Sequence, residues 1–147
     1  MRDVAIVAFA QSDQERRVED RNEVELLSPV IQDVYAQTGM TAADFGFTCS
    51  GSTDYLAGQA FSFVLTLDSV GPWPPISESH VEMDGAWAMY EAWIKIQTGA
   101  IDTALVYAYG KSSPGDLRAV MSRQMDPYYV APLWADSVAL AALQAQS

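Results

Sequence analysis

His80 and Glu82 are the two residues whose types and spacing best suit catalytic chemistry. In an extended backbone, side chains two positions apart point to the same side, so the imidazole and the carboxylate can form a pair. Such a pair can contribute acid–base groups to a reaction. Each residue also has a structural interpretation: a carboxylate near a helix N-terminus caps the helix, and a lone histidine near a strand end commonly serves packing.

The chain has one histidine and one cysteine, which leaves no ligand spacing typical of a metal site. The sequence therefore predicts no metal ion and no bound cofactor. Cys49 is a candidate nucleophile, because it precedes small residues at a predicted strand end. No histidine lies near it in the sequence to activate the thiol, so a buried, inert cysteine is the favoured interpretation.

The segment that carries His80 and Glu82 predicts a helix followed by a buried strand. Asp84 can accept hydrogen bonds from the free N–H groups of a helix start, and Gly85 permits close approach of a ligand or another backbone. Apolar side chains, with Trp87 and Tyr90 along one face, then occupy much of the circumference up to Gly99, so we expect a mostly buried helix. A continuous apolar run follows, which is typical of a central strand covered on both faces.

The rest of the chain predicts further strands and helices in alternation. Pro29 falls within the apolar stripe of residues 23–38, so either Ser28 caps a shorter helix or a longer helix kinks there. Thr41 to Asp44 resembles a short capping box. The predicted fold class is α/β, with a layered β-α-β-α-β-α-β core. Its strands are expected at residues 4–10, 45–50, 76–83 and 103–108, and its helices at residues 23–38, 55–70 and 85–97.

Two further residues lie where strands are expected to end. Ser50 belongs to a run of small residues at the end of the second predicted strand, and strand ends of α/β sheets form ligand crevices. Lys111 follows the last predicted strand, but the glycine spacing of a phosphate-binding loop is missing there. With Arg118 and Arg123, it could meet the phosphates of a ligand or a partner surface, and the partner surface is the favoured interpretation.

The glycine-opened helix is followed by I-x-x-G-x-x-D-x-A-L-V, from Ile96 to Val106. This pattern resembles the nucleophile helix and following strand of the thiolase superfamily, most closely its sterol-carrier-protein-type or lipid-transfer branch. The likeness extends to residues 4–10, 47–58 and 111–118. Family members usually carry C-[AS]-[ST]-G at the helix start. Alignment of that glycine on Gly85 places Glu82 where the reactive cysteine stands, so the nucleophile is missing.

The resemblance implies two regions: a thiolase-like N-terminal α/β core at residues 1–110, and, at residues 111–147, the start of an incomplete loop region with a truncated helix. In this family a second half of similar topology supplies catalytic His and Cys residues and much of the acyl-CoA contact. We therefore expect a homo- or hetero-oligomer with a C-terminal thiolase-like half, a related subunit or a second copy.

The function that the resemblance implies is acyl-CoA handling in lipid or sterol degradation, with a coenzyme A thioester as substrate. A carboxylate does not easily replace a thiolate in acyl transfer, so carbon–carbon cleavage, such as a retro-aldol reaction, suits this chain better than thiolysis. The expected enzyme is an acyl-CoA lyase or acyltransferase in complex with a second chain. The alternatives are a noncatalytic partner subunit and an inactive truncated fragment. The predicted catalytic residues are Glu82 and His80, and the predicted substrate-binding residues are Gly85, Ser50 and Lys111.

Composition limits the range of functions and locations. The formal net charge of −11 argues against nucleic-acid binding, which needs Lys and Arg to neutralise phosphates. All basic residues lie in residues 2–21 and 95–123, and residues 22–94 hold ten acidic residues, which we interpret as a solvated acidic surface. A single cysteine permits no internal disulfide and fits a cytoplasmic location. The apolar stretch near the N-terminus is too short for a signal peptide or a membrane span.

Overall fold

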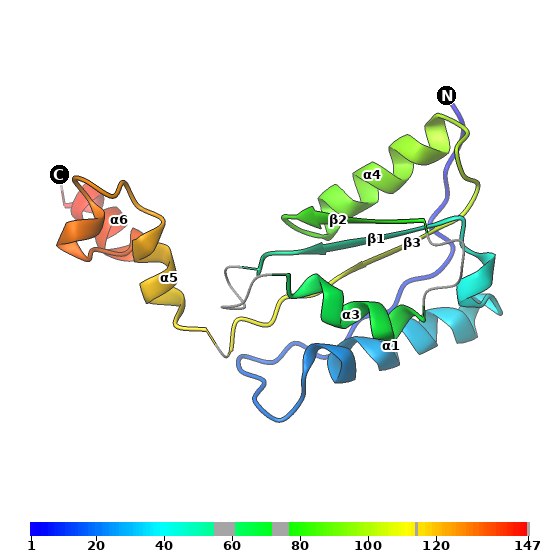
Figure 1. The fold of residues 1–147 in the computed structure, drawn as a ribbon, viewed down its shortest axis with the longest axis horizontal. Helices are drawn as coiled ribbons and strands as arrows, with labels where there is room; N and C mark the ends of the chain where they lie inside the picture. The colour runs from blue at the N-terminus through cyan, green and yellow to red at the C-terminus, as the bar shows by residue number, and fades with distance from the viewer. Residues whose placement is uncertain (55–60, 72–76, 114, 147) are drawn as a thin grey trace.

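The structure is a computed structural model that describes residues 1–54, 61–71, 77–113 and 115–146. These residues form an α/β fold around a three-stranded parallel sheet with the strand order β2-β1-β3 (Figure 1), which confirms the predicted fold class at this level. The strands are β1 (Phe47–Ser52), β2 (Glu78–Glu82) and β3 (Ala104–Ala108). The helices are α1 (Glu23–Thr38), α3 (Phe63–Val70), α4 (Gly85–Gln97), α5 (Leu117–Arg123) and α6 (Ser137–Ala145), with short 3-10 helices η1 (Ala42–Asp44) and η2 (Ala131–Leu133).

The central strand of the described sheet is β1, which pairs with both neighbours. Ser50 of β1 lies opposite His80 of β2 and opposite Tyr107 of β3. Because parallel strands all end at the same edge of a sheet, the segments that follow them come together there. These segments begin at Thr53, Met83 and Tyr109.

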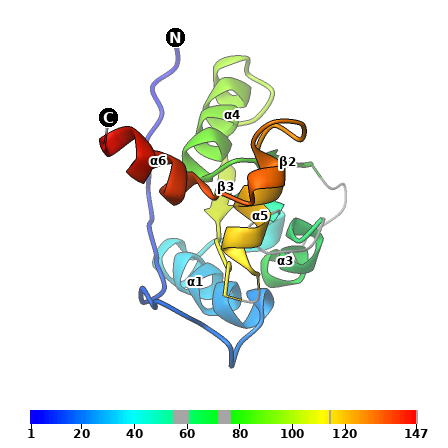
Figure 2. The same cartoon turned by 90° about the vertical axis from the view of Figure 1, so that its left-hand side faces the viewer.

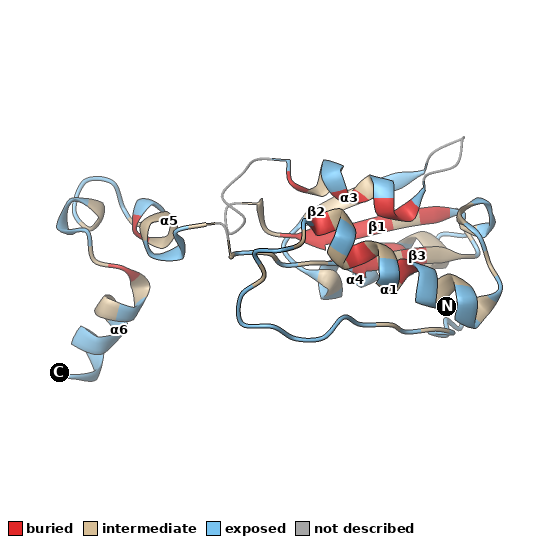
Figure 3. Ribbon diagram, turned by 90° about the horizontal axis from the view of Figure 1, so that it is seen from below, coloured by how far each residue is buried: buried red, intermediate tan, exposed pale blue. Residues whose placement is uncertain are grey.

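Helices cover both faces of the sheet, with α4 on one face and α1 and α3 on the other (Figures 1 and 2). On the α4 face, the buried residues Phe47, Cys49, Ala88 and Ala92 pack together. A second buried cluster forms on the opposite face; its members are Leu27, Ile31, Val70, Leu105 and Tyr107. Figure 3 shows the buried residues concentrated in the strands and on the inward sides of these helices. Burial of both faces accounts for the apolar run of β3, but the expectation of a central strand is wrong: in the described sheet β3 lies at an edge, beside β1.

Helix α4 forms where the sequence predicts it, with Asp84 as its N-cap. The Asp84 carboxylate accepts hydrogen bonds from two backbone N–H groups of the first turn, at 3.0 and 3.2 Å. The expectation of a mostly buried helix is wrong: only Ala88 and Ala92 are buried, whereas Trp87 and Tyr90 are 50% and 52% exposed. A single stripe of small residues contacts the sheet, so the larger apolar side chains remain outside the core.

Helix α1 resolves the alternatives that Pro29 leaves open in the sequence. The helix is continuous from Glu23 to Thr38 and includes Pro29. Its N-terminus has a full capping box, in which the Asn22 side chain and the Glu25 side chain each accept from the other residue's backbone N–H. Pro29 is exposed, so the Glu25 carbonyl that loses its helical partner can bind water instead.

The first strand that the sequence predicts, at residues 4–10, does not form. This segment pairs with no described strand, and Val7 and Phe9 are exposed. Near its start, Arg2 forms an ion pair with Asp102, beyond the end of α4. An apolar run becomes a strand only where a neighbouring strand satisfies its backbone hydrogen bonds, and this segment has no such neighbour among the described residues.

Two predicted elements extend beyond the described residues. The predicted helix at residues 55–70 is seen as α3, and residues 55–60 lie outside the described part of the chain. The predicted strand at residues 76–83 is seen as β2, and Ile76 lies outside as well. The capping box expected from Thr41 to Asp44 is present at the start of η1.

The segment after β3 leads to α5, η2 and α6, which lie apart from the sheet (Figures 1 and 3). Asp136 caps α6, where its carboxylate accepts from the N–H of Ala139 at 2.8 Å and from Arg118 Nε at 2.5 Å. Both contacts, the backbone hydrogen bond first, lower the pKa of Asp136. No helix in the described ranges has the length and apolar content needed to cross a membrane.

Candidate functional site

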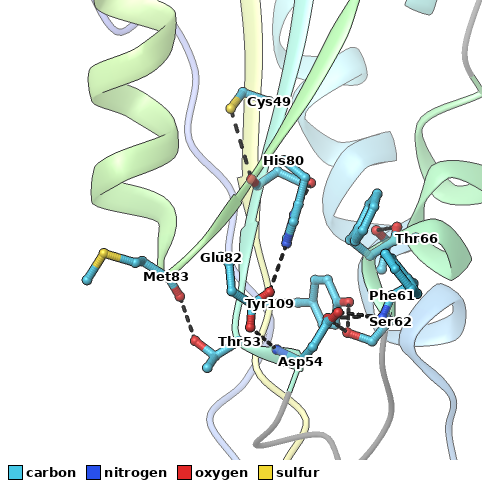
Figure 4. A network of polar contacts seen from close by, with 12 residues as sticks. Cys49, Thr53, Asp54, Phe61, Ser62, Thr66, His80, Glu82, Met83 and Tyr109 are labelled. Carbon is cyan, nitrogen blue, oxygen red and sulfur yellow. Dashed lines mark hydrogen bonds and ion pairs between the residues drawn. The ribbon is translucent and has the colours of Figure 1, made fainter.

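The two predicted catalytic residues lie side by side on β2. His80 and Glu82 project from the same side of this strand, and His80 Nε2 lies 3.3 Å from Glu82 Oε2 (Figure 4). The His80 side chain is 12% exposed and that of Glu82 is 50% exposed. The structure therefore brings the imidazole and carboxylate together within reach of solvent, as their spacing in sequence predicts.

The second nitrogen of His80 contacts Ser50, at the paired position of β1. Ser50 Oγ lies 2.9 Å from His80 Nδ1, and Ser50 is itself buried. The Phe63 ring stacks on the imidazole with ring centroids 4.1 Å apart and an interplanar angle of 9°. In one tautomer, Nδ1 accepts from the Ser50 hydroxyl and Nε2–H donates to Glu82. In the other tautomer, Nδ1–H donates to Ser50 Oγ and Nε2 carries a free lone pair. The orientation of the imidazole is fixed in either case.

Asp54 is a third ionisable member of the site, which the sequence does not predict. The backbone N–H of Asp54 donates to Glu82 Oε1 at 2.8 Å. Its carboxylate accepts from the backbone N–H groups of Phe61 and Ser62 and from the Ser62 hydroxyl (Figure 4). Asp54 lies 26 positions before His80, so no spacing within one strand or helix could indicate the contact; its place just after β1 was the only signal.

A chain of hydroxyl groups leads from Asp54 toward β3. Ser62 Oγ lies 2.5 Å from Asp54 Oδ1 and 2.7 Å from the hydroxyl oxygen of Tyr109. Burial is the main cause that raises the pKa of Tyr109 above its ordinary value. Tyr109 is therefore protonated at neutral pH, and its hydroxyl can act as a hydrogen-bond donor in this network.

A cavity of about 430 Å³ lies at the edge of the sheet where the parallel strands end. Its wall includes Tyr109 and Lys111 from the segment after β3, Met83 and Asp84 from the turn between β2 and α4, and Ser52 from β1. Ser52 is buried, and among the described residues its hydroxyl has no hydrogen-bond partner. Lys111 is the one predicted site residue in the wall of this cavity. Ser50, Gly85 and the catalytic candidates His80 and Glu82 are outside its lining, and Thr53 and Ser62 connect the cavity to the polar network around Glu82.

Gly85 and Gly51 serve close packing of backbone segments. A Cβ atom on Gly85 would lie 2.8 Å from the Cβ of Ala108, so the glycine lets the start of α4 approach β3. A Cβ atom on Gly51 would lie 2.3 Å from the carbonyl oxygen of Asp84. These contacts show how the turn before α4 is held against β1 and β3.

Glu82 does not cap α4. It is the last residue of β2, and the free N–H groups of the helix are bound by Asp84 instead. Glu82 accepts from Asp54 N and contacts His80, so the helix-capping interpretation holds for Asp84 and is wrong for Glu82. The carboxylate of Glu82 is therefore directed to the polar network rather than to the helix.

Cys49 is fully buried, as the sequence reasoning favoured. Burial, followed by the nearby charge of Glu91, raises the pKa of the thiol to about 12. A thiol of this kind carries almost no reactive thiolate near neutral pH. Cys49 consequently contributes to the core between β1 and α4 rather than to the polar site.

No family model, curated protein or solved structure matches this chain. The resemblance to the thiolase superfamily therefore remains a prediction from the sequence motifs.

Proposed function

We propose that this chain provides acid–base groups for carbon–carbon cleavage of an acyl-CoA thioester, in a site completed by a second chain. The observation that supports the proposal best is the His80–Glu82 pair, with Ser50 on the second imidazole nitrogen. The substrate class comes from the likeness to thiolases and from the absence of a cysteine at the position of Glu82. The proposal places the chain in lipid or sterol degradation.

The proposed reaction is the retro-aldol cleavage of a 3-hydroxyacyl thioester. The His80–Glu82 pair accepts the proton of the 3-hydroxyl group, and the bond between C2 and C3 breaks. C3 leaves as an aldehyde or ketone, and the electron pair of the broken bond forms an enolate on the thioester fragment. Return of the proton to C2 gives a shortened acyl thioester, so the reaction needs no oxidant or other co-reactant.

The cavity at the carboxyl ends of the strands is the proposed entrance for the thioester. Lys111 in its wall suits the negative charges of the coenzyme A phosphates. The buried hydroxyl of Ser52, which lacks a partner among the described residues, suits a carbonyl oxygen of the substrate. These roles follow the general rule that ligands bind outside the carboxyl ends of parallel strands.

The need for a second chain is proposed from the apolar surface. Val7 and Phe9 of the N-terminal segment and Trp87 and Tyr90 of α4 are all exposed. Exposed apolar surface commonly marks an interaction site, and on α4 the rings of Trp87 and Tyr90 adjoin each other. A C-terminal thiolase-like half, a related subunit or a second copy would cover them.

A noncatalytic role is the second candidate. The same exposed aromatic residues of α4 would support a subunit that stabilises an active partner without chemistry of its own. In that case the acid–base pair would be dispensable, and only substitutions at the contact surface would affect the activity of the complex.

The test uses the complex purified from the source cells, with each variant expressed in place of the wild-type chain. The assay follows release of the aldehyde or ketone from 3-hydroxyacyl thioesters. Glu82→Gln should lower kcat by about 10²- to 10⁴-fold, because it removes the proton acceptor with little change in shape. Glu78→Gln, on the same strand, is the matched control. Unchanged turnover in the Glu82 variant would exclude the acid–base proposal and favour the noncatalytic role.

A further inference from the structure

We propose that Asp54, His80 and Glu82 form a binding site for one divalent first-row transition-metal ion. A carboxylate oxygen of Asp54, a ring nitrogen of His80 and a carboxylate oxygen of Glu82 all lie within 4.8 Å of one another. The sequence alone predicts no metal site, because the chain has one histidine and no ligand spacing typical of one. The fold supplies the third ligand from a distant position, in the segment after β1.

The distances can be compared with those around a common ion. Ligand atoms about 2.1 Å from one ion in tetrahedral geometry are about 3.4 Å apart, and in any geometry no two can be more than about 4.2 Å apart. His80 Nε2 and Glu82 Oε2 are already separated by 3.3 Å, which is long for a charge-assisted hydrogen bond of about 2.7–2.9 Å. The widest separation in the group, up to 4.8 Å, would have to close by about 1.4 Å for a tetrahedral ion, through movement of the Asp54 and Glu82 carboxylates.

Each proposed ligand is already oriented by a neighbour. Ser50 Oγ can accept from His80 Nδ1–H, which leaves the Nε2 lone pair for an ion. The Asp54 N–H donates to Glu82 Oε1, which leaves Oε2 for the ion. Asp54 Oδ1 accepts hydrogen bonds from the Ser62 N–H and the Ser62 hydroxyl. Such supporting hydrogen bonds around every ligand distinguish this group from a chance gathering of surface acids.

The local charge also favours a cation. Two carboxylates and one imidazole meet here, and neither Asp54 nor Glu82 forms an ion pair with a Lys or Arg of the described residues. Residues 22–94 contain no Lys or Arg at all. A divalent ion would balance the two carboxylates, and the half-exposed side chain of Glu82 leaves the site accessible.

The ligand set points to the class of ion. One imidazole with two carboxylates suits Zn²⁺ or Mn²⁺, which accept mixed nitrogen and oxygen ligands. Mg²⁺ prefers oxygen ligands alone and should bind more weakly. Three protein ligands would leave open positions for water or substrate.

This inference does not depend on the proposed reaction. The ion would use the same atoms, His80 Nε2 and Glu82 Oε2, that the acid–base pair uses. Ion binding can be measured without substrate, whereas the proposed reaction is measured by turnover, so either proposal can fail while the other stands.

The test is isothermal titration calorimetry, in which the untagged, chelator-treated chain is titrated with ZnCl₂, MnCl₂ and MgCl₂. We expect one Zn²⁺ per chain, and affinities at least 10-fold lower for Mg²⁺ and for Glu82→Gln and Asp54→Asn. Glu78→Gln should bind as the wild type does. Equal Zn²⁺ affinity in wild type and both ligand variants, or no binding by the wild type, would overturn the proposal.

A second measurement guards against variants that fold poorly. Zn²⁺ should raise the melting temperature of the wild type and of Glu78→Gln, because it binds the folded chain only. In His80→Gln the shift should be reduced or lost while circular dichroism shows an unchanged fold. Binding of Co²⁺, followed by its absorption spectrum, should show the imidazole ligand in the wild type alone; identical spectra in the His80 variant would contradict the assignment.

Discussion

At the scale of single residues, the site depends on how buried hydroxyl groups are satisfied. Ser50 and Ser52 both lie on β1, and they are 2% and 3% exposed. The Ser50 hydroxyl contacts His80 Nδ1, whereas that of Ser52 has no partner among the described residues. A hydroxyl that is buried without a hydrogen bond destabilises the folded state. A hydroxyl that forms a hydrogen bond with a buried ring nitrogen stabilises it. The same substitution at the two positions should therefore have opposite consequences.

Ser50→Ala should lower the free energy of unfolding by about 1–3 kcal/mol, because it leaves the mostly buried His80 Nδ1 without a partner. Ser52→Ala should be neutral or stabilise the fold by up to about 1 kcal/mol, because it removes an unpaired hydroxyl. Urea unfolding of both variants measures the difference. Equal losses at the two positions would show that the hydrogen bond to His80 does not set the stability of this site.

At the scale of elements, close backbone approach positions the turn before α4. The absence of a side chain at Gly51 lets β1 approach the carbonyl oxygen of Asp84, and Gly85 lets α4 approach Ala108. These contacts fix Met83 and Asp84 in the wall of the cavity. Gly110 lines the same cavity, but an added Cβ there would meet nothing within 4 Å.

Gly51→Ala should destabilise the fold by about 3 kcal/mol or more, because the added Cβ would lie 2.3 Å from backbone atoms that no rotamer change can move away. Gly110→Ala should change the free energy of unfolding by less than about 1 kcal/mol. Both values come from chemical denaturation. A tolerated alanine at position 51 would show that close backbone contact between β1 and the turn before α4 is not needed for the fold.

The sequence predicts elements that depend on neighbouring residues and misses features that depend on distant ones. The Asp84 cap and the strand formed by the apolar run of β3 are local, and both form as expected, whereas the edge position of β3 in the described sheet depends on distant segments. The sequence does not predict which face of α4 contacts the sheet. Trp87 and Tyr90 have the apolar character of a buried face, but Ala88 and Ala92 make the contact. Asp54 was missed because its contact with Glu82 exists only after β1 and β2 pair.

At the scale of the whole molecule, the fold leaves the outer aromatic residues of α4 without a role in the core. Trp87 and Tyr90 meet edge to face with centroids 6.1 Å apart, and Tyr90 stacks on Trp93 at 5.8 Å. The aromatic rings therefore form one continuous strip along a helix that contacts the sheet through its alanines. A partner that covers this strip would remove a large apolar surface from water. Burial of apolar surface stabilises a complex by about 25 cal/mol for each Å².

We expect this strip to form the contact in the proposed association with a second chain. The double variant Trp87→Ser/Tyr90→Ser should then dissociate at least 10-fold more readily while its melting temperature changes little. Little change is expected because both side chains are already half exposed in the single chain. The matched control is Tyr128→Ser/Tyr129→Ser, which removes two aromatic residues that are each 82% exposed in the segment apart from the sheet. Native mass spectrometry and sedimentation velocity of complexes purified from the source cells measure the effect. If the control variant dissociates as readily as the α4 variant, general loss of apolar surface explains the result; if neither dissociates, the contact lies elsewhere, with the exposed N-terminal segment around Val7 as the next surface to alter.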